Sequence, residues 1–329
     1  MDYSQILSQQ FNIKEEYAKN IITLLDDGNT IPFIARYRKE MHGSMDDQLI
    51  REFAEKLEYL RGLDKRRDEI RSLIDAQEKL TDEINLALDK AATLSELEDI
   101  YRPYRPKRKT RASIAKEKGL EPLANDILKQ EKGFDPSKSA VDYIDEEKGV
   151  TSVEDAIQGA MDIIAELVSD NAEIRKRIRN LTNANGVLVS VATDEEKDSV
   201  YKNYYDYKEP VKKIAGHRVL AVNRGEKEGF LKVSVETDSE KPLNSIFRAM
   251  ITDKNQLCSD IIREACTDAY QRLIYPSIER EVRNDLTDTA SENAMKVFAV
   301  NLKQLLMQPP VKGKTVLALD PGYRTGCKT

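Results

Sequence analysis

The chain has 329 residues, of which 40% are apolar and 33% are charged, with no tryptophan and a formal net charge of -6. This length predicts two or more domains, and the apolar content is sufficient for hydrophobic cores. Because 58 Asp and Glu outnumber 52 Lys and Arg, the chain as a whole would repel a polyanion. A nucleic-acid surface must therefore be a local basic patch.

Several classes of site and location are excluded by the residue content. Cys258, Cys266 and Cys327 are an odd number without Cys-x-x-Cys spacing, which argues against a disulfide framework and a zinc knuckle. His42 and His217 have no Cys or His at metal-ligand spacing, and we expect no cofactor. The N-terminus lacks signal-peptide features, and no apolar run approaches the ~20 residues of a membrane span. We expect a cytoplasmic protein with no membrane partner.

The abundance of Leu, Ile, Ala, Glu, Lys and Arg favours a mainly α fold, and residues 1–80 are predicted to be its first helical domain. Apolar periodicity predicts a helix over 14–27 that ends at Gly28. Pro32 can begin a second helix over 33–39. Short helices joined by tight turns resemble a helix-turn-helix arrangement, although any small helical bundle does so as well.

A long third helix is predicted next. Ser44, with Asp47 three residues later, has the pattern of an N-terminal cap. The apolar stripe that begins at Leu49 and Phe53 continues toward Ile74. We therefore expect this helix to extend well past the first bundle and to act as a strut.

Residues 81–186 are predicted to be a second helical segment that contains a basic loop, 102–111. Pro103 and Pro106 exclude regular helix from that loop. The helices predicted around it are at 81–92, at 95–101, a short one that closes at Gly119, one opened by Pro122, one capped by Ser152 with Asp155, and a continuation that ends near Asn185.

Residues 187–240 are predicted to be a small β element within the helical chain. Val187–Val191 has the apolar pattern of a strand. The runs at 217–222 and 230–235 are separated by a glycine-containing segment, which predicts a β-hairpin.

Residues 241–310 are predicted to form a helical bundle. Its helices are predicted at 246–251, 258–274, 277–283 and 291–307. Gln308-Pro-Pro310 ends the bundle, which places the best domain boundary at 309–314. Residues 311–329 then contain the apolar run Thr315–Leu319, predicted as a strand that opens a new domain.

Asp320 ends that strand, the position at which RNase H-type nucleases place a first Mg²⁺ ligand. Such sites need further carboxylates from later strands, so Asp320 is expected to hold a metal only if a further domain completes the site. We expect the chain to be a truncated fragment that acts by binding or by organising a larger protein, without catalysis of its own.

The basic loop is the main candidate for nucleic-acid contact. Its extended, proline-stiffened backbone would display cations to phosphates and tyrosine faces to bases. The candidate residues are Arg102, Tyr104, Arg105, Lys107, Arg108, Lys109 and Arg111. The alternative, which is equally compatible with the sequence, is an internal clamp in which these arginines bridge acidic helix faces, such as that of Glu96, Glu98 and Asp99, inside the protein.

Two further basic clusters lie on predicted helices. Arg36, Arg38 and Lys39 form one of them, and Arg175–Arg179 forms the other. Taken singly, each is predicted to be a solvated helix face. If they gather on one side of the fold with the basic loop, they would form a stripe that follows a phosphate backbone.

Two other patterns favour structure over ligand binding. Four tyrosines lie among lysines at Tyr201–Tyr207, which suits a single-strand stacking platform, but packing against the neighbouring β element is the preferred interpretation. Gly313-Lys-Thr315 is not a phosphate loop, because the strand follows the motif instead of preceding it and Gln308 stands where a glycine is needed.

Five motifs in the same order resemble the bacterial Tex family of transcription accessory proteins. They are Phe33–Gly43, Leu97–Arg111, Lys118–Leu123, Arg224–Gly229 and Leu319–Lys328. The resemblance implies an N-terminal helical region with a helix-turn-helix-like part, followed by a YqgF domain of RNase H-like fold, helix-hairpin-helix modules and an RNA-binding OB-fold. This chain would hold the first region and the opening strand of the YqgF domain.

From the residues and the resemblance together, we expect a non-catalytic N-terminal scaffold of a Tex-like nucleic-acid-binding factor that acts in transcription or RNA metabolism. RNA, DNA or both are the expected partners of the full-length protein. Two alternatives stay open. The chain could be part of a metal-dependent RNase H-like nuclease completed by later domains, or a scaffold that docks on RNA polymerase or the ribosome.

Overall fold

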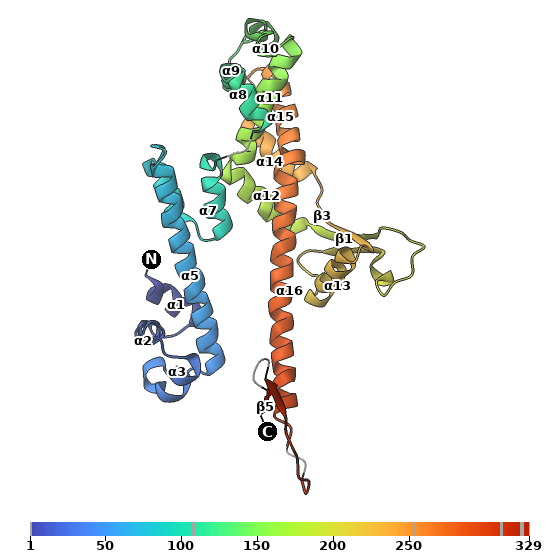
Figure 1. The fold of residues 1–329 in the computed structure, drawn as a ribbon. Coiled ribbons are helices and arrows are strands. Elements are labelled where there is room, and N and C mark those ends of the chain that lie inside the picture. The colour runs from blue at the N-terminus through green and yellow to red at the C-terminus, as the bar shows by residue number, and fades with distance from the viewer. Residues whose placement is uncertain (1, 107–108, 253, 310–311, 323–325, 329) are drawn as a thin grey trace. The chain divides into compact units, whose positions relative to one another are not determined.

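The computed structural model describes residues 2–106, 109–252, 254–309, 312–322 and 326–328, without the side chains of 320–322 and 327–328 (Figure 1). The chain divides into two compact units. Unit 1 contains Met1–Asn180 and Ser239–Pro276, and unit 2 contains Leu181–Asp238 and Ser277–Thr329. The expected mainly α fold is confirmed, with a long strut helix, and the described residues also form a three-stranded and a two-stranded antiparallel sheet.

Unit 1 begins with a bundle of short helices on one long helix. In chain order they are α1 (Tyr3–Phe11), α2 (Glu15–Asp26), α3 (Ile31–Tyr37), α4 (Lys39–His42) and α5 (Asp47–Asp75). Their core is fully buried at Ile21, Ile34 and Phe53. The predicted end of α2 is confirmed, because Gly28 takes the left-handed conformation with φ of 79°. The helix-turn-helix-like character of this bundle stays a prediction.

The predicted cap of the long helix is wrong by two residues. Asp46 is the N-cap of α5, and its carboxylate accepts a 2.8 Å hydrogen bond from the N–H of Leu49. Ser44 instead lies in the turn before it with a positive φ. The strut itself is confirmed, since α5 has 29 residues and its buried stripe continues to Ile70 and Ile74 in a second core.

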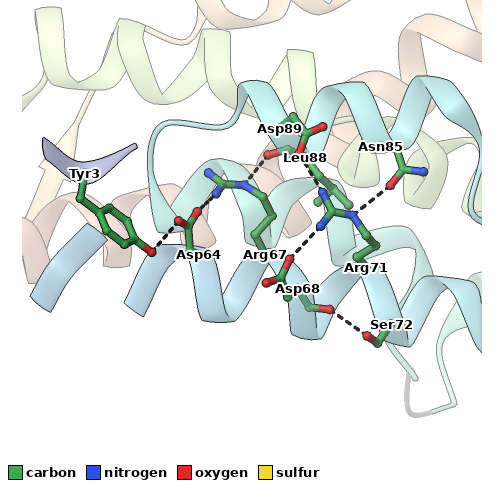
Figure 2. Close-up of polar contacts among 9 residues, drawn as sticks. All are labelled: Tyr3, Asp64, Arg67, Asp68, Arg71, Ser72, Asn85, Leu88 and Asp89. Carbon is green, nitrogen blue, oxygen red and sulfur yellow. Dashed lines mark hydrogen bonds and ion pairs between the residues drawn. The ribbon is translucent and has the colours of Figure 1, made fainter. Parts of the chain in front are cut away.

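Arginines on the second half of α5 attach the next helix, α6 (Asp82–Lys90), to the strut (Figure 2). The buried guanidinium of Arg67 donates to the Leu88 carbonyl at 2.9 Å and to the Ala91 carbonyl at 3.0 Å, and it pairs with Asp64. One turn later Arg71 donates to Asn85 at 3.0 Å. Carbonyls at the end of a helix have no partner within it, and Arg67 supplies one.

Most of the remaining helices of unit 1 pack on one central helix. In chain order the remaining elements are α7 (Leu94–Tyr101), η1 (Arg102–Tyr104), α8 (Arg111–Glu117), α9 (Glu121–Lys129), α10 (Pro136–Ala140), η2 (Val141–Tyr143), α11 (Val153–Asp170), α12 (Ala172–Asn185, which continues into unit 2), α14 (Glu240–Met250), α15 (Gln256–Asp268) and η4 (Ala269–Ile274). The central helix α11 contacts α8, α9 and α15, while α7 packs on α5 and α14 on α15. Ser152 caps it as predicted, accepting from the N–H of Asp155 at 3.1 Å. Gly159 permits close packing here, because a Cβ would lie 2.3 Å from the Leu120 side chain.

Unit 2 is built on a three-stranded antiparallel sheet in the order β2-β1-β3. Its elements are β1 (Val187–Ala192), η3 (Lys202–Tyr204), β2 (Asp206–Pro210), α13 (Gly216–Lys227), β3 (Leu231–Glu236) and most of α16 (Tyr275–Leu306). In the register, Ser190 lies opposite both Tyr207 and Val233. The strands predicted at 187–191 and 230–235 are confirmed.

The predicted hairpin is wrong in its first arm, because residues 217–222 belong to the helix α13. Val219 and Val222 are three residues apart and both are buried, with Gly225 following on the same face. A short apolar run does not distinguish a strand from a buried helix by periodicity alone, and here tertiary packing selected the helix.

The helices predicted at 277–283 and 291–307 are parts of one continuous helix, α16. No proline or glycine separates them in the sequence, so nothing interrupts the hydrogen-bond ladder. Glu279 and Arg283, one turn apart on α16, bind the outer edge of β3. Glu279 accepts from the N–H of Val235 at 3.0 Å, and Arg283 donates to the Val233 carbonyl at 3.0 Å.

The last turns of α16 expose apolar side chains, among them Met295 at 63% and Phe298 at 66% exposure. Among the described residues, none of the helices has the length and apolar character needed to cross a membrane. The strand predicted at Thr315–Leu319 is wrong, since no described segment pairs with it. The strands in this region are β4 (Asp320–Gly322) and β5 (Gly326–Lys328), which pair with each other.

Candidate nucleic-acid interface

The first two arginines of the predicted basic loop are paired with carboxylates of unit 1. Arg102 lies with its Nε 3.3 Å from the Asp170 carboxylate at the end of α11. Burial, and secondarily the charge of Arg175, lower the pKa of Arg102 below its usual range. Arg105 pairs with Glu98 on α7, and its guanidinium lies 5.6 Å from the ring centroid of Tyr101. These contacts are those of the internal clamp.

Glu98 is shared between two arginines. Its other carboxylate oxygen accepts a 2.7 Å hydrogen bond from Arg66 on α5, which raises the pKa of Arg66. Tyr104, the predicted stacking residue, is half-buried against the core of α5, α6 and α7. Its carbonyl accepts from Gln77 at 2.9 Å. The start of the loop is thus fixed to the strut.

The later part of the loop is more open. Lys109 is exposed and lies 3.6 Å from Glu117. Arg111, the first residue of α8, is exposed, and within the described ranges no carboxylate lies at ion-pairing distance from it. Lys107 and Arg108 lie outside the described residues. Of the loop cations that the structure describes, Arg111 is therefore the most available to a ligand.

The third basic cluster is only in part the solvated face that was predicted, because Lys176 and Arg177 are exposed whereas Arg175 is buried. Arg175 and Arg179 on α12 both donate to the buried carboxylate of Asp99 at 2.5 Å. Lys176 lies 2.8 Å from Glu96, and this hydrogen bond lowers the pKa of Glu96. The acidic face of α7 does bind arginines, but Asp99 takes them from α12, a helix that is distant in sequence.

The second basic cluster has no ion pair among the described residues. Arg36 is exposed in the last turn of α3, Lys39 is exposed at the start of α4, and Arg38 lies half-buried between the two helices. In the described part of the chain, no carboxylate lies at ion-pairing distance from any of the three. Here the structure leaves cations free, as a phosphate-binding surface requires.

Two aromatic residues beside this cluster were missed by the sequence reasoning. Phe33 and Tyr37 lie four residues apart on α3 with ring centroids 5.3 Å apart. The guanidinium of Arg38 lies 5.2 Å from the Phe33 centroid and donates to the Tyr37 carbonyl at 3.1 Å. The i, i+4 spacing of two aromatics opposite the buried Ile34 was the available signal.

The remaining candidates do not add to this surface. Tyr201 is buried in the core of unit 2, with Tyr204 and Tyr205 packed against it, so the preferred packing interpretation is confirmed. The side chain of Asp320 lies outside the described residues. Over the ranges that the structure describes, no three His, Cys, Asp or Glu side chains are grouped as a metal ion would require.

Two family models match the sequence. "Tex-like protein N-terminal domain" matches residues 1–75, and "Tex central region-like" matches residues 131–298, about half of the chain. The chain belongs to the Tex family of proteins. This agrees with the resemblance carried by the five sequence motifs.

Individual relatives match along the whole chain. It is similar to "Uncharacterized protein YdcI" of Bacillus subtilis, at 45% identity over 100% of this chain and 47% of the relative. It is 37% identical to "Transcriptional accessory protein Tex" of Neisseria gonorrhoeae, over 100% of this chain and 44% of the relative. The human "S1 RNA-binding domain-containing protein 1" is 32% identical over 99% of this chain and 34% of its own length. The chain thus spans less than half of the length of these curated relatives.

Proposed function

We propose that this chain is the non-catalytic N-terminal scaffold of a Tex-like, nucleic-acid-binding accessory factor that acts in transcription or RNA metabolism. The observation that carries the proposal is the match along the whole chain to relatives named as a transcriptional accessory protein and as an S1 RNA-binding domain-containing protein. RNA, DNA or both are the proposed partners of the complete protein.

Direct contact with phosphates is assigned by pairing and exposure. A cation that already has a carboxylate partner must break that ion pair before it binds a phosphate, whereas a free cation only releases counterions. Arg102 and Arg105 are paired within the fold, while Arg36, Arg38 and Lys39 are not. We therefore assign the main contacts to the second basic cluster, with a contribution from the open end of the loop at Lys109 and Arg111.

This proposal is tested with the 329-residue chain itself. Fluorescence anisotropy with labelled RNA and DNA, at several salt concentrations, should give binding that weakens as salt rises, because phosphate contacts release counterions. No binding to either probe at low salt rejects nucleic-acid binding by this chain.

The enzyme alternative makes a separate prediction. If the complete protein is an RNase H-like nuclease, it should cleave nucleic acid only with Mg²⁺, and Asp320→Asn should abolish cleavage while binding persists. Binding without cleavage, in the presence of Mg²⁺, supports the non-catalytic proposal.

A scaffold that docks on RNA polymerase or the ribosome is the second candidate, and the exposed apolar turns of α16 favour it. Met295, Phe298, Leu302 and Leu305 repeat at spacings of three and four and are all exposed, a pattern typical of a helix face that binds protein. A pull-down of either partner that survives nuclease treatment supports docking. Loss of the partner after nuclease treatment shows that nucleic acid bridges the two.

A further inference from the structure

The outer face of α3 combines an open aromatic ring with free cations. Ile34 and Ala35 turn inward and are buried in the first core. Phe33, Arg36 and Tyr37 share the opposite face, because residues three and four apart in a helix are neighbours. The helix thus divides into a face that anchors it and a face that it presents outward.

The aromatic pair is arranged so that one ring is supported and the other is available. Phe33 is half-buried, with the guanidinium of Arg38 5.2 Å from its centroid. Tyr37 packs against Phe33 at a tilt of 42° and is 64% exposed. An exposed tyrosine ring held on one side by another ring is a rigid surface on which a planar group can stack.

The charge around this ring is positive. From Ile31 to Gly43 the sequence has three basic side chains, those of Arg36, Arg38 and Lys39, and one carboxylate, Glu40. None of the three cations has a carboxylate partner among the described residues. The exposed ring is therefore flanked by charges that suit an anionic ligand.

We propose that this surface, the α3 platform, is a binding site for single-stranded nucleic acid. It is formed by Phe33, Arg36, Tyr37, Arg38 and Lys39. An unpaired base stacks on the open face of Tyr37, and Arg36 and Lys39 bind the phosphates on either side. A duplex buries its base faces between neighbouring pairs, so only an unpaired strand can use the ring. This inference rests on the proposed nucleic-acid function and locates its contact.

The chain contains a matched control for this surface. On α5, the Nζ of Lys56 lies 4.7 Å from the centroid of the Tyr59 ring, and Tyr59 is 43% exposed. Glu55 and Glu58 adjoin this pair in sequence. In the part of the chain that the structure describes, an exposed tyrosine beside a cation is thus present twice, once with free positive charge and once among carboxylates, which repel phosphates.

The experiment compares Tyr37→Ala, Tyr37→Phe and Tyr59→Ala in the 329-residue chain. The probes are labelled oligouridine, oligothymidine and a DNA duplex of the same length, and circular dichroism confirms that each variant is folded. Tyr37→Ala should weaken binding of the single strands roughly 5- to 150-fold, the range for loss of one stacked base. Tyr37→Phe retains the ring and should bind normally, as should Tyr59→Ala. The two single-stranded probes separate RNA from DNA.

The combined variant Arg36→Ala, Lys39→Ala tests the phosphate contacts. Loss of these two contacts should reduce the slope of log K against log salt by about 1.4 for a single strand. Single-strand binding that is equal in Tyr37→Ala and Tyr59→Ala overturns the α3 platform and leaves the proposed function standing, and the surface is then a candidate protein contact. If Tyr37→Ala weakens binding of the duplex as much as binding of the single strands, stacking of an unpaired base on Tyr37 is wrong. If the unchanged chain binds no probe, the platform and nucleic-acid binding by this chain are both rejected.

Discussion

Two basic segments of unit 1 are similar in sequence but differ in whether their arginines are paired with carboxylates. Residues 36–39 and 102–111 both combine arginine, lysine and tyrosine, yet Arg105 and Arg102 are bound to carboxylates whereas Arg36 is free. The partners come from outside the segments, from α7 and from the end of α11. Charge density along a sequence therefore shows where cations are, and the pairing in the fold shows which of them a ligand can use.

The largest expected effect is at the carboxylate that holds α12. Asp99→Ala would leave Arg175 and Arg179 buried without it, and we expect a loss of about 3–5 kcal/mol of unfolding free energy. Urea unfolding followed by circular dichroism measures it.

The control is Asp126→Ala, which removes an exposed pair with Lys129 and should change stability by no more than about 0.5 kcal/mol. If both variants lose the same unfolding free energy, burial of the ion pairs of Asp99 does not increase their contribution to stability.

Next in size is Arg105→Gln, which tests the clamp directly. It removes the pair with Glu98 and the contact with the Tyr101 ring, and because the pair is partly exposed we expect a loss of about 1 kcal/mol. RNA affinity should stay within about twofold, since this guanidinium is already paired with Glu98. If Arg105→Gln lowers RNA affinity more than Arg36→Gln does, the basic loop, and not the cluster at 36–39, provides the main RNA contact.

A smaller, pH-dependent effect is expected from Glu96. Its hydrogen bond with Lys176 lowers the pKa of Glu96 in the folded state below the ordinary value of 4.5. A carboxyl with a lowered folded pKa contributes stability above that ordinary value and loses it as the pH falls through the folded value. Because Lys176 is half exposed and solvent screens the pair, the contribution should be no more than about 1 kcal/mol.

Acid titration of stability measures the Glu96 contribution. Lys176→Met should reduce the loss between pH 5 and pH 3 relative to the unchanged chain. If the unfolding free energies of both proteins fall equally between pH 5 and pH 3, the Glu96–Lys176 pair does not contribute to stability.

The smallest effect on stability is expected at the exposed cluster. Arg36→Gln removes no described ion pair, so unfolding free energy should change by less than about 0.5 kcal/mol. RNA binding should weaken, with a salt slope reduced by about 0.7. Thermal unfolding and anisotropy on the same sample measure both. A destabilised variant with unchanged binding would make Arg36 a structural residue.

Features set by neighbouring residues could be predicted from the sequence. The end of α2 at Gly28, the Ser152 cap and the strand Val187–Val191 each depend on a few adjacent positions. Packing of Tyr201 was also predicted, because a large ring beside an apolar strand is usually buried with it. The division of the chain into five segments stays a prediction.

Features set by distant residues could not be predicted. The apolar periodicity of α12 identifies its buried face. It does not reveal that Arg175 lies on that face, because Asp99, the partner of Arg175, is on another helix. Likewise, residues 217–222 have apolar content that suits a strand, and only packing against the sheet and α16 makes them helical. The exposure of the Tyr37 side chain could not be predicted either, because it depends on which surfaces of α3 the other helices cover.

The edge of β3 has a consequence for synthesis of the chain. An unpaired strand edge is a template for adding a strand from another molecule. On β3, α13 covers the outward N–H of Val233 through Glu226, while α16 covers the Val233 carbonyl and the Val235 N–H. The α16 side chains, Glu279 and Arg283, are translated more than 40 residues after β3. Until α16 leaves the ribosome, the Val233 carbonyl and the Val235 N–H are uncovered, so a nascent chain paused within this interval offers part of a strand edge to another molecule.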